Sequence, residues 1–295
     1  MEGARTIRRG ADGYPAALAR VMGSGAPEQL RVRGELGAGS MRRVALVGTR
    51  HPDRYGLEMA QRMATDLVRA GVSVISGGAE GIDAAAHQAA LGARGHTVAV
   101  FGCGLDVVYP VAHRELFADI VASGGALVSE YDDGFPASRY TFPRRNRIVS
   151  GLSDAVVVVR AGEQSGALIT ADWATKQGVP VFAVPADVGH PLSAGPLALL
   201  RRGARVATCA DDVLTALGVQ MQLPLGSDAP LAEVPADLAA PVAAVLGALG
   251  RTPQHADEVA RATGLKSGSA LAALLDLELK GLCEQRPGQY FVRRG

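Results

Sequence analysis

The chain has 295 residues, more than the ~100–200 residues usual for one domain, so a large domain joined to a small one is expected. Hydrophobic residues make up 48% of it, ample for a core, but the formal net charge of +1 gives no support to nucleic-acid binding, which must rest on where the arginines lie. Three widely spaced cysteines argue against a disulfide framework or a zinc site and fit a reducing cytoplasm, and no apolar segment resembles a signal peptide or approaches the ~20 residues that span a membrane.

The first 40 residues are expected to be a short lead-in, with Met1–Asp12 poorly ordered and Tyr14–Leu36 following it. Short apolar runs then alternate with stretches of helical periodicity. The predicted strands are Val44–Val47, Val72–Ile75, Thr97–Phe101, Ala126–Ser129, Ala155–Val159 and Pro180–Val184. The predicted helices between them are Leu57–Ala70, Ile82–Arg94, His113–Ser123, Gly166–Gln177 and Ala194–Arg202. Apolar strands joined by crossover helices predict a doubly wound, Rossmann-like α/β domain with a mostly parallel sheet over residues 41–218.

A smaller domain is predicted after a proline-rich linker at residues 219–235. Its first helix is marked by an apolar stripe at Leu238, Val242, Val245 and Leu249. Two further helices, His255–Thr263 and Ala270–Leu282 (with Ser267 as its cap), precede a hairpin over Cys283–Val292. This order predicts a winged-helix domain over residues 236–295. Because the third helix is rich in Ala and Leu, we expect little sequence-specific DNA binding from it.

Four glycine-rich turns follow predicted strands of the large domain. They are Val47-Gly48-Thr49-Arg50, Ser76-Gly77-Gly78-Ala79, Gly102-Cys103-Gly104-Leu105 and Ser165-Gly166-Ala167. Ligands of parallel sheets collect beyond the carboxyl ends of the strands, where glycine lets the backbone approach an oxyanion and hydroxyls add donors. Four such turns on one sheet edge predict a site for an anionic ligand.

These turns do not match the common nucleotide-binding motifs. The turn after Thr97–Phe101 imitates a dinucleotide fingerprint, but its third glycine is missing and Tyr109-Pro110 would interrupt the helix that receives the pyrophosphate. No Gly-Lys-Ser/Thr follows any turn, as a P-loop requires. Asp83 and His87 share one helix face, a spacing that more often fixes local structure than performs catalysis. We therefore expect no cofactor, no metal site and no catalytic residue.

The segment Arg139–Arg147 interleaves aromatic and cationic side chains, the composition that stacks bases beside neutralised phosphates. Pro143 fits the first turn of a helix, which would place the following residues near an N-terminus whose free N–H groups favour anions. The alternative is a solvated cationic turn, or an Arg147 paired with a core carboxylate such as Asp154. Because the segment shares its sheet with four glycine turns and Arg50, we expect it to contact phosphate.

As a set, these motifs resemble the DNA-processing protein A (DprA/Smf) family over residues 14–215. The resemblance is carried by V-G-T-R at 47–50, S-G-G-A-E-G-I-D-A-A-A-H at 76–87, G-C-G-L-D-V-V-Y-P at 102–110, F-P-R-R-N-R-I at 142–148 and S-G-A-L-I-T at 165–170. It implies an extended Rossmann-like fold and a homodimeric cytoplasmic protein that is not an enzyme. Such a protein would bind and protect single-stranded DNA and load the RecA recombinase onto it during natural transformation, helping to displace single-strand binding protein.

The resemblance also implies which residues meet the DNA. By position, Arg50 would contact a phosphate beside the backbone N–H groups of Gly48 and Thr49, Arg139 would contact DNA, and Phe142 would meet a base. The full expected set is Gly48, Thr49, Arg50, Ser76, Gly77, Gly78, Arg139, Phe142, Arg144, Arg145, Asn146, Arg147, Ser165 and Gly166.

Some positions extend or depart from the family pattern. Arg144, Arg145 and Arg147 extend its basic surface, which leaves open that one of them is structural, and Asn146 is expected to pin the turn. Arg160 stands where an acidic residue is common. The N-terminal helical module of many relatives is expected to be reduced to the lead-in. The main alternative function is a nucleotide phosphoribohydrolase on a related Rossmann-like core, although the P-G-G-x-G-T turn of such enzymes is replaced here by Ser-Gly-Ala.

Overall fold

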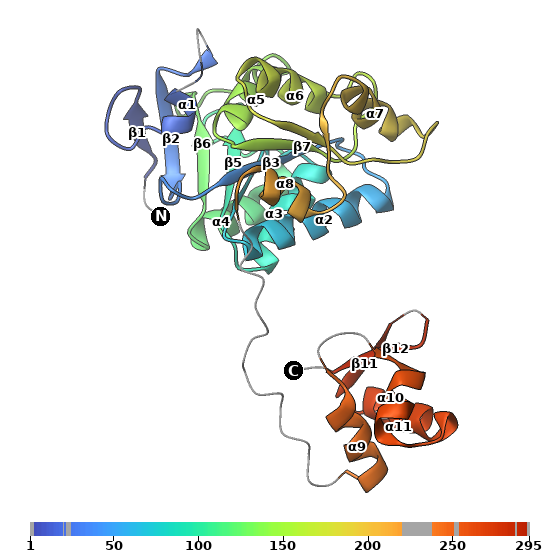
Figure 1. Cartoon of the computed structure of the whole chain (residues 1–295). Helices are drawn as coiled ribbons and strands as arrows, with labels where there is room; N and C mark the ends of the chain where they lie inside the picture. Colours follow the sequence, from blue (N-terminus) through green and yellow to red (C-terminus); the bar gives the residue numbers. More distant parts are fainter. Residues whose placement is uncertain are drawn as a thin grey trace. The chain divides into compact units, whose positions relative to one another are not determined.

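The computed structural model describes residues 3–19, 21, 25–219, 238–250, 254–286 and 288–293. They belong to two compact units, Met1–Gln222 and Leu223–Gly295 (Figure 1). The expected linker at 219–235 lies outside the described residues apart from Val219. Within the described ranges, no helix combines the length and the apolar character needed to cross a membrane.

A nine-stranded sheet forms the centre of the first unit, in the order β1-β2-β6-β5-β4-β3-β7-β8-β9. Its strands are β1 (Arg5–Arg8), β2 (Gln29–Gly34), β3 (Arg43–Val47), β4 (Ser73–Ser76), β5 (Thr97–Phe101), β6 (Ala126–Ser129), β7 (Ala155–Val158), β8 (Val181–Ala183) and β9 (Arg205–Val206). From β6 to β9 every neighbouring pair is parallel, and the antiparallel pairs, β1 with β2 and β2 with β6, lie at one edge. The predicted doubly wound, mostly parallel sheet is therefore confirmed.

Helices cover both faces of this sheet. They are α1 (Ala16–Ala19), α2 (Arg54–Arg69), α3 (Ile82–Gly92), α4 (Arg114–Ala122), α5 (Thr141–Gly151), α6 (Gly166–Lys176), α7 (Ala194–Arg201) and α8 (Ala210–Ala216). Helices α2, α3 and α8 pack on one face with Val44, Leu46 and Val74. Helices α5, α6 and α7 pack on the other with Ala45 and Ile75 (Figure 1). Successive strand residues enter different cores because side chains alternate across a strand.

The prediction for the first residues was wrong. Instead of being poorly ordered, Arg5–Arg8 forms strand β1, which pairs with β2. Strand β2 in turn pairs antiparallel with β6. Strand β1 is ordered because β2 provides a strand for it to pair with. In β2, Leu30 and Val32 are fully buried and alternate with polar residues, the period-two pattern of a half-buried strand.

The second unit is the predicted winged helix. Its elements are α9 (Ala240–Ala248), β10 (Gln254–His255), α10 (Ala256–Thr263), α11 (Ser267–Leu279), β11 (Cys283–Arg286) and β12 (Tyr290–Arg293), with the strands in the order β10-β12-β11. Helix α11 begins three residues before the predicted Ala270 and ends before Leu282. It ends early because Gly281 has a positive φ of 73°, a conformation that terminates helices. Leu275 and Leu279 lie exposed on α11.

Candidate nucleic-acid interface

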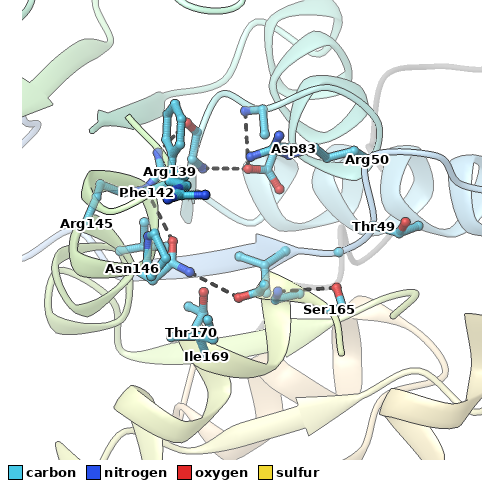
Figure 2. A pocket seen from close by; sticks show the side chains of 18 of the residues that line it. Thr49, Arg50, Asp83, Arg139, Phe142, Arg145, Asn146, Ser165, Ile169 and Thr170 are labelled. Carbon is cyan, nitrogen blue, oxygen red and sulfur yellow. Dashed lines mark hydrogen bonds between the residues drawn. The ribbon is translucent and has the colours of Figure 1, made fainter. Parts of the chain in front are cut away.

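A cleft of about 590 Å³ opens beyond the carboxyl ends of β3, β4 and β7, between α5 and α6 (Figure 2). Its volume lies in the range of ordinary ligand sites, ~300–1,000 Å³. The cleft brings together residues from three of the four predicted turns and from the 139–147 segment, including Gly48, Thr49, Arg50, Gly77, Arg139, Phe142, Arg145, Asn146, Ser165 and Gly166. The fourth predicted turn, Gly102-Cys103-Gly104-Leu105, does not line it. The sheet edge predicted to bind an anion is thus hollow and lined by the expected residues.

Two exposed cations stand at this cleft. Arg50 and Arg139 both line it, and neither has a carboxylate within ion-pairing distance among the described residues. Asp83 is the one carboxylate that lines the cleft in the described part of the chain, and it is buried. The charge balance of the cleft is therefore positive, although the chain as a whole is nearly neutral.

Aromatic rings lie beside these cations. The rings of Tyr109 and Phe142 are 5.2 Å apart and inclined by 34°. The Arg50 guanidinium lies 5.6 Å from the Phe142 centroid, and that of Arg139 lies 4.9 Å from the ring of Tyr140. Rings and guanidinium planes are the surfaces on which unpaired bases stack. Tyr109 was missed as a site residue, although the motif at 102–110 contains it.

The first turn of α5 differs from the prediction. The Ser138 hydroxyl accepts hydrogen bonds from the N–H groups of Tyr140 and Thr141, both at 3.3 Å. The Ser138 carbonyl accepts from the Phe142 N–H at 3.4 Å, and Pro143 has no N–H to offer. These backbone donors are therefore already used or absent, so this end of α5 presents side chains to an anion rather than free N–H groups.

The three arginines of α5 fall on different sides of the helix. Arg145 points into the sheet, is only 5% exposed, and donates to the carbonyls of Gly77 and Val100. Burial lowers the pKa of its guanidinium, an effect that the nearby Asp83 carboxylate opposes. Its expected place on the DNA-binding surface is corrected accordingly: Arg145 lines the floor of the cleft, where its Nη1 donates to two backbone carbonyls and its Nε donates to the Asn146 side chain.

Arg147 was also expected to meet DNA, and its environment contradicts that. It forms a two-pronged ion pair with Glu130, with both N–O distances at 2.7 Å and side-chain exposures of 6% and 8%. The alternative partner named from the sequence, Asp154, accepts instead from Arg42 and from the backbone N–H of Arg43. Two buried charges that satisfy each other hold α5 against the end of β6. Of the three, only Arg144 is exposed, its side chain at 65%.

The glycine turns act partly through packing. A methyl group added at Gly48 would lie 2.5 Å from Ile82, and one at Gly77 would lie 2.5 Å from the Arg145 guanidinium. Close approach of neighbouring side chains therefore already explains glycine at both positions. Ser76 is buried and donates to the Leu46 carbonyl, so its hydroxyl does not face the cleft. Gly78 is also buried and borders a smaller recess beside the cleft.

Backbone donors differ between the first and the last turn. The Thr49 N–H, expected beside a phosphate, donates to the Arg160 carbonyl at 2.7 Å and is not available. At the start of α6, by contrast, the Gly166 N–H has no acceptor among the described residues, while Ser165 caps the helix through Ala167. The positive end of the α6 dipole thus lies at the cleft with a free donor. Asn146 donates to the Gly166 carbonyl at 3.1 Å, so it ties α5 to the start of α6.

Asp83 and His87 both have local structural roles. Asp83 accepts from the N–H groups of Gly77 and Ala79, which fixes the second glycine turn. Burial raises the pKa of its carboxyl, and the Arg145 guanidinium opposes that rise. The His87 ring lies 2.7 Å from the Thr97 hydroxyl, and burial lowers its pKa to about 3. The interpretation of this pair as structural rather than catalytic fits these contacts.

Comparison with known proteins identifies the family to which this chain belongs. The family profile of DNA recombination-mediator protein A matches residues 5–218, and that of the DprA winged helix domain matches residues 229–289. The chain belongs to the DprA family. It is 40% identical over 268 residues to the protein Smf of Escherichia coli, covering 90% of this chain and 71% of the relative.

Two solved DprA structures are similar to this chain. The X-ray structure from Streptococcus pneumoniae matches with a TM-score of 0.66 and 35% identity, over 72% of this chain and 74% of that one. A structure from Helicobacter pylori, described for the single-stranded DNA binding mode of that protein, matches with a TM-score of 0.63 and 28% identity, over 72% of this chain and 95% of that one.

One departure from the DprA pattern has a clear structural role. Arg160 is buried and pairs with Asp53 through both carboxylate oxygens, at 3.1 and 2.6 Å. Asp53 also caps α2 by accepting from the Gly56 N–H at 2.8 Å. Burial alone would raise the pKa of Asp53, but these hydrogen bonds outweigh it and lower the pKa below its usual value. Arg160 therefore anchors α2 beside the cleft instead of contacting a ligand.

Proposed function

We propose that this DprA family member binds single-stranded DNA in the cleft between α5 and α6. The observation that carries the proposal is that two cations with no carboxylate partner among the described residues, Arg50 and Arg139, line the same cleft as the neighbouring rings of Tyr109 and Phe142. Phosphates would meet the guanidinium groups and the Gly166 N–H, while bases would stack on the rings. Because no contact of this kind reads base edges, binding would be largely independent of sequence.

Unpaired strands suit the cleft better than duplex. Stacking requires the ring faces of bases to be accessible, which they are in single strands and not inside a duplex. The similarity to the Helicobacter pylori protein, whose single-stranded DNA binding has been described structurally, supports the same choice of ligand. No cofactor enters the proposal.

We extend the proposal to a cellular role, which rests on the family. As a DNA recombination mediator, the chain would act as a homodimer that protects incoming single strands and loads RecA onto them during natural transformation. It would act in the cytoplasm, and its three cysteines are all free. A direct test is the rate at which RecA assembles on strands coated with single-strand binding protein. Addition of this protein should raise that rate, and the Arg50→Ala variant should not.

Binding itself is tested with oligo-dT across a salt series. Wild type should bind oligo-dT more tightly than duplex of equal length. Arg50→Ala and Arg139→Ala should each weaken binding several-fold and lower the log–log salt slope by ~0.7, the contribution of one phosphate contact in a single strand. Arg62→Ala on the opposite face of the sheet removes another exposed positive charge and is the control. Equal affinity for both forms of DNA, or normal binding by both cleft variants, would refute the proposal.

The alternative, a nucleotide phosphoribohydrolase, has less support. Its turn would need a carboxylate just downstream on α6, and Asp172 is the residue available there. Asp172 is exposed, lies 3.8 Å from Arg202, and does not line the cleft. We therefore propose that the chain is not an enzyme. Release of free base from a nucleoside monophosphate, measured by chromatography, would reverse that conclusion.

A further inference from the structure

A second basic groove lies on the other side of α5. It has a volume of about 810 Å³, and the charged residues that line it are Arg8, Arg9, Glu28, Glu130, Arg144 and Arg147. Arg8 ends strand β1, Arg9 follows it, and Arg144 and Arg147 come from α5. The groove therefore joins the N-terminal edge of the sheet to the helix that forms one wall of the cleft.

The charges of this groove are not cancelled internally. Glu130 is already neutralised by Arg147, and Arg144 lies 3.7 Å from the same carboxylate with a largely exposed side chain. Arg8 and Arg9 are exposed and make no ion pair within the described part of the chain. The acidic residue that remains is Glu28, which is exposed as well. Three accessible guanidinium groups against one carboxylate favour a polyanion.

Helix α5 connects the two sites. Phe142, Pro143 and Asn146 line the cleft, whereas Arg144 and Arg147 line the basic groove. An α-helix with its side chains is ~10 Å wide, so only a few nucleotides are needed to pass from one side to the other.

We propose that the basic groove holds the continuation of the single strand bound in the cleft, with Arg8, Arg9 and Arg144 on its phosphates. This inference rests on the proposed function and extends its footprint across α5. Among the described residues that line it, the groove offers guanidinium groups but no aromatic ring, so it would hold mainly the backbone while the cleft holds bases. Short oligonucleotides would fill the cleft alone, and longer ones would reach both sites.

The test compares oligo-dT of about 6 and about 20 nucleotides, within and beyond the site sizes usual for single-strand binders. Fluorescence anisotropy is measured on the full chain for wild type, for the Arg8→Ala/Arg9→Ala double variant, and for the control Arg62→Ala/Arg69→Ala. Both control residues are exposed on α2 and their loss changes the net charge equally. The first variant should lose about tenfold affinity for the long oligonucleotide, with a salt slope lower by ~1.4 for two phosphates. Its affinity for the short one should stay within twofold.

Other outcomes separate this inference from the function on which it rests. Unchanged binding of the long oligonucleotide by the Arg8→Ala/Arg9→Ala variant would overturn the groove and leave the cleft intact. Equal losses at both lengths, or an equal loss in the control, would overturn it too, since they indicate a general effect of charge. If wild type binds neither length, or Arg50→Ala binds both normally, the proposed function itself is refuted, and the groove inference with it. Unchanged thermal unfolding of each variant verifies that folding is intact.

Discussion

Replacing Arg147 with methionine tests whether this arginine is part of the fold or of the DNA-binding surface. The substitution leaves the Glu130 carboxylate, 8% exposed, without its two-pronged partner. Breaking a buried ion pair in this way costs ~3–5 kcal/mol. We expect a value near the lower end, about 3 kcal/mol, because the Arg144 guanidinium lies 3.7 Å from the same carboxylate and can take over part of the interaction. A domain of ordinary stability would remain folded.

The assay is urea unfolding followed by tryptophan fluorescence. The single tryptophan, Trp173, lies in α6, so its signal reports the α/β unit separately from the winged helix. Combining Arg147→Met with Glu130→Leu should recover most of the loss, since replacing both partners by apolar groups is often nearly neutral. Arg144→Met, at an exposed position, should change stability by less than ~0.5 kcal/mol. If Arg147→Met unfolds like wild type yet binds oligo-dT poorly, the structural role assigned to Arg147 is wrong.

Three further predictions address the cleft, the core and the tail. A methyl group at Gly166 meets nothing within 4 Å, so Gly166→Ala should leave the melting temperature unchanged or slightly higher, and a drop in oligo-dT affinity would then report close approach of DNA to this backbone. Because His87 has a pKa of about 3 in the fold and ~6.5 when unfolded, its contribution to stability is complete above pH ~6.5 and is lost as the pH falls toward 3. Urea titrations should therefore show about 2 kcal/mol of this loss by pH ~5, and His87→Phe should be less sensitive to pH over this range. Leu279 is 89% exposed, so Leu279→Lys should leave the free energy of unfolding nearly unchanged and should change the oligo-dT dissociation constant by less than about twofold. A larger gain or loss of affinity would show that α11 takes part in binding.

Much of the fold was predictable because its signals are local. Strands β3 to β8 are short apolar runs and helices α2, α3, α4, α6 and α7 show clear periodicity, so these were predicted within a few residues of their observed bounds, whereas β2, β9, α1 and α8 were not predicted. Strand β1 was not predicted either, since Ile7 is its one apolar residue and it exists through pairing with β2. Such pairing between distant segments leaves no local pattern in the sequence.

The location of the site on the sheet was predictable from the sequence, but the roles of its individual residues were less so. Glycine turns and cations mark the sheet edge, but the sequence does not say which way an arginine on a helix points. Arg145 and Arg147 were grouped with Arg144, and their long side chains instead reach backbone carbonyls and Glu130 inside the fold. The Thr49 N–H was likewise assigned to a phosphate. Its acceptor is the Arg160 carbonyl, and because the two residues lie far apart in the chain, no local pattern in the sequence indicates this hydrogen bond.

The anchoring of α5 has a consequence for how DNA is met. Arg145 fixes the helix to β4 and β5, Arg147 fixes it to Glu130 after β6, and Asn146 fixes it to α6. The entropy cost of ordering this wall is thus met when the protein folds, and a strand that binds there encounters a preorganised surface. Amide protons of α5 should therefore exchange slowly with solvent before any DNA is added, and association should be governed by electrostatic steering rather than by rearrangement of the protein.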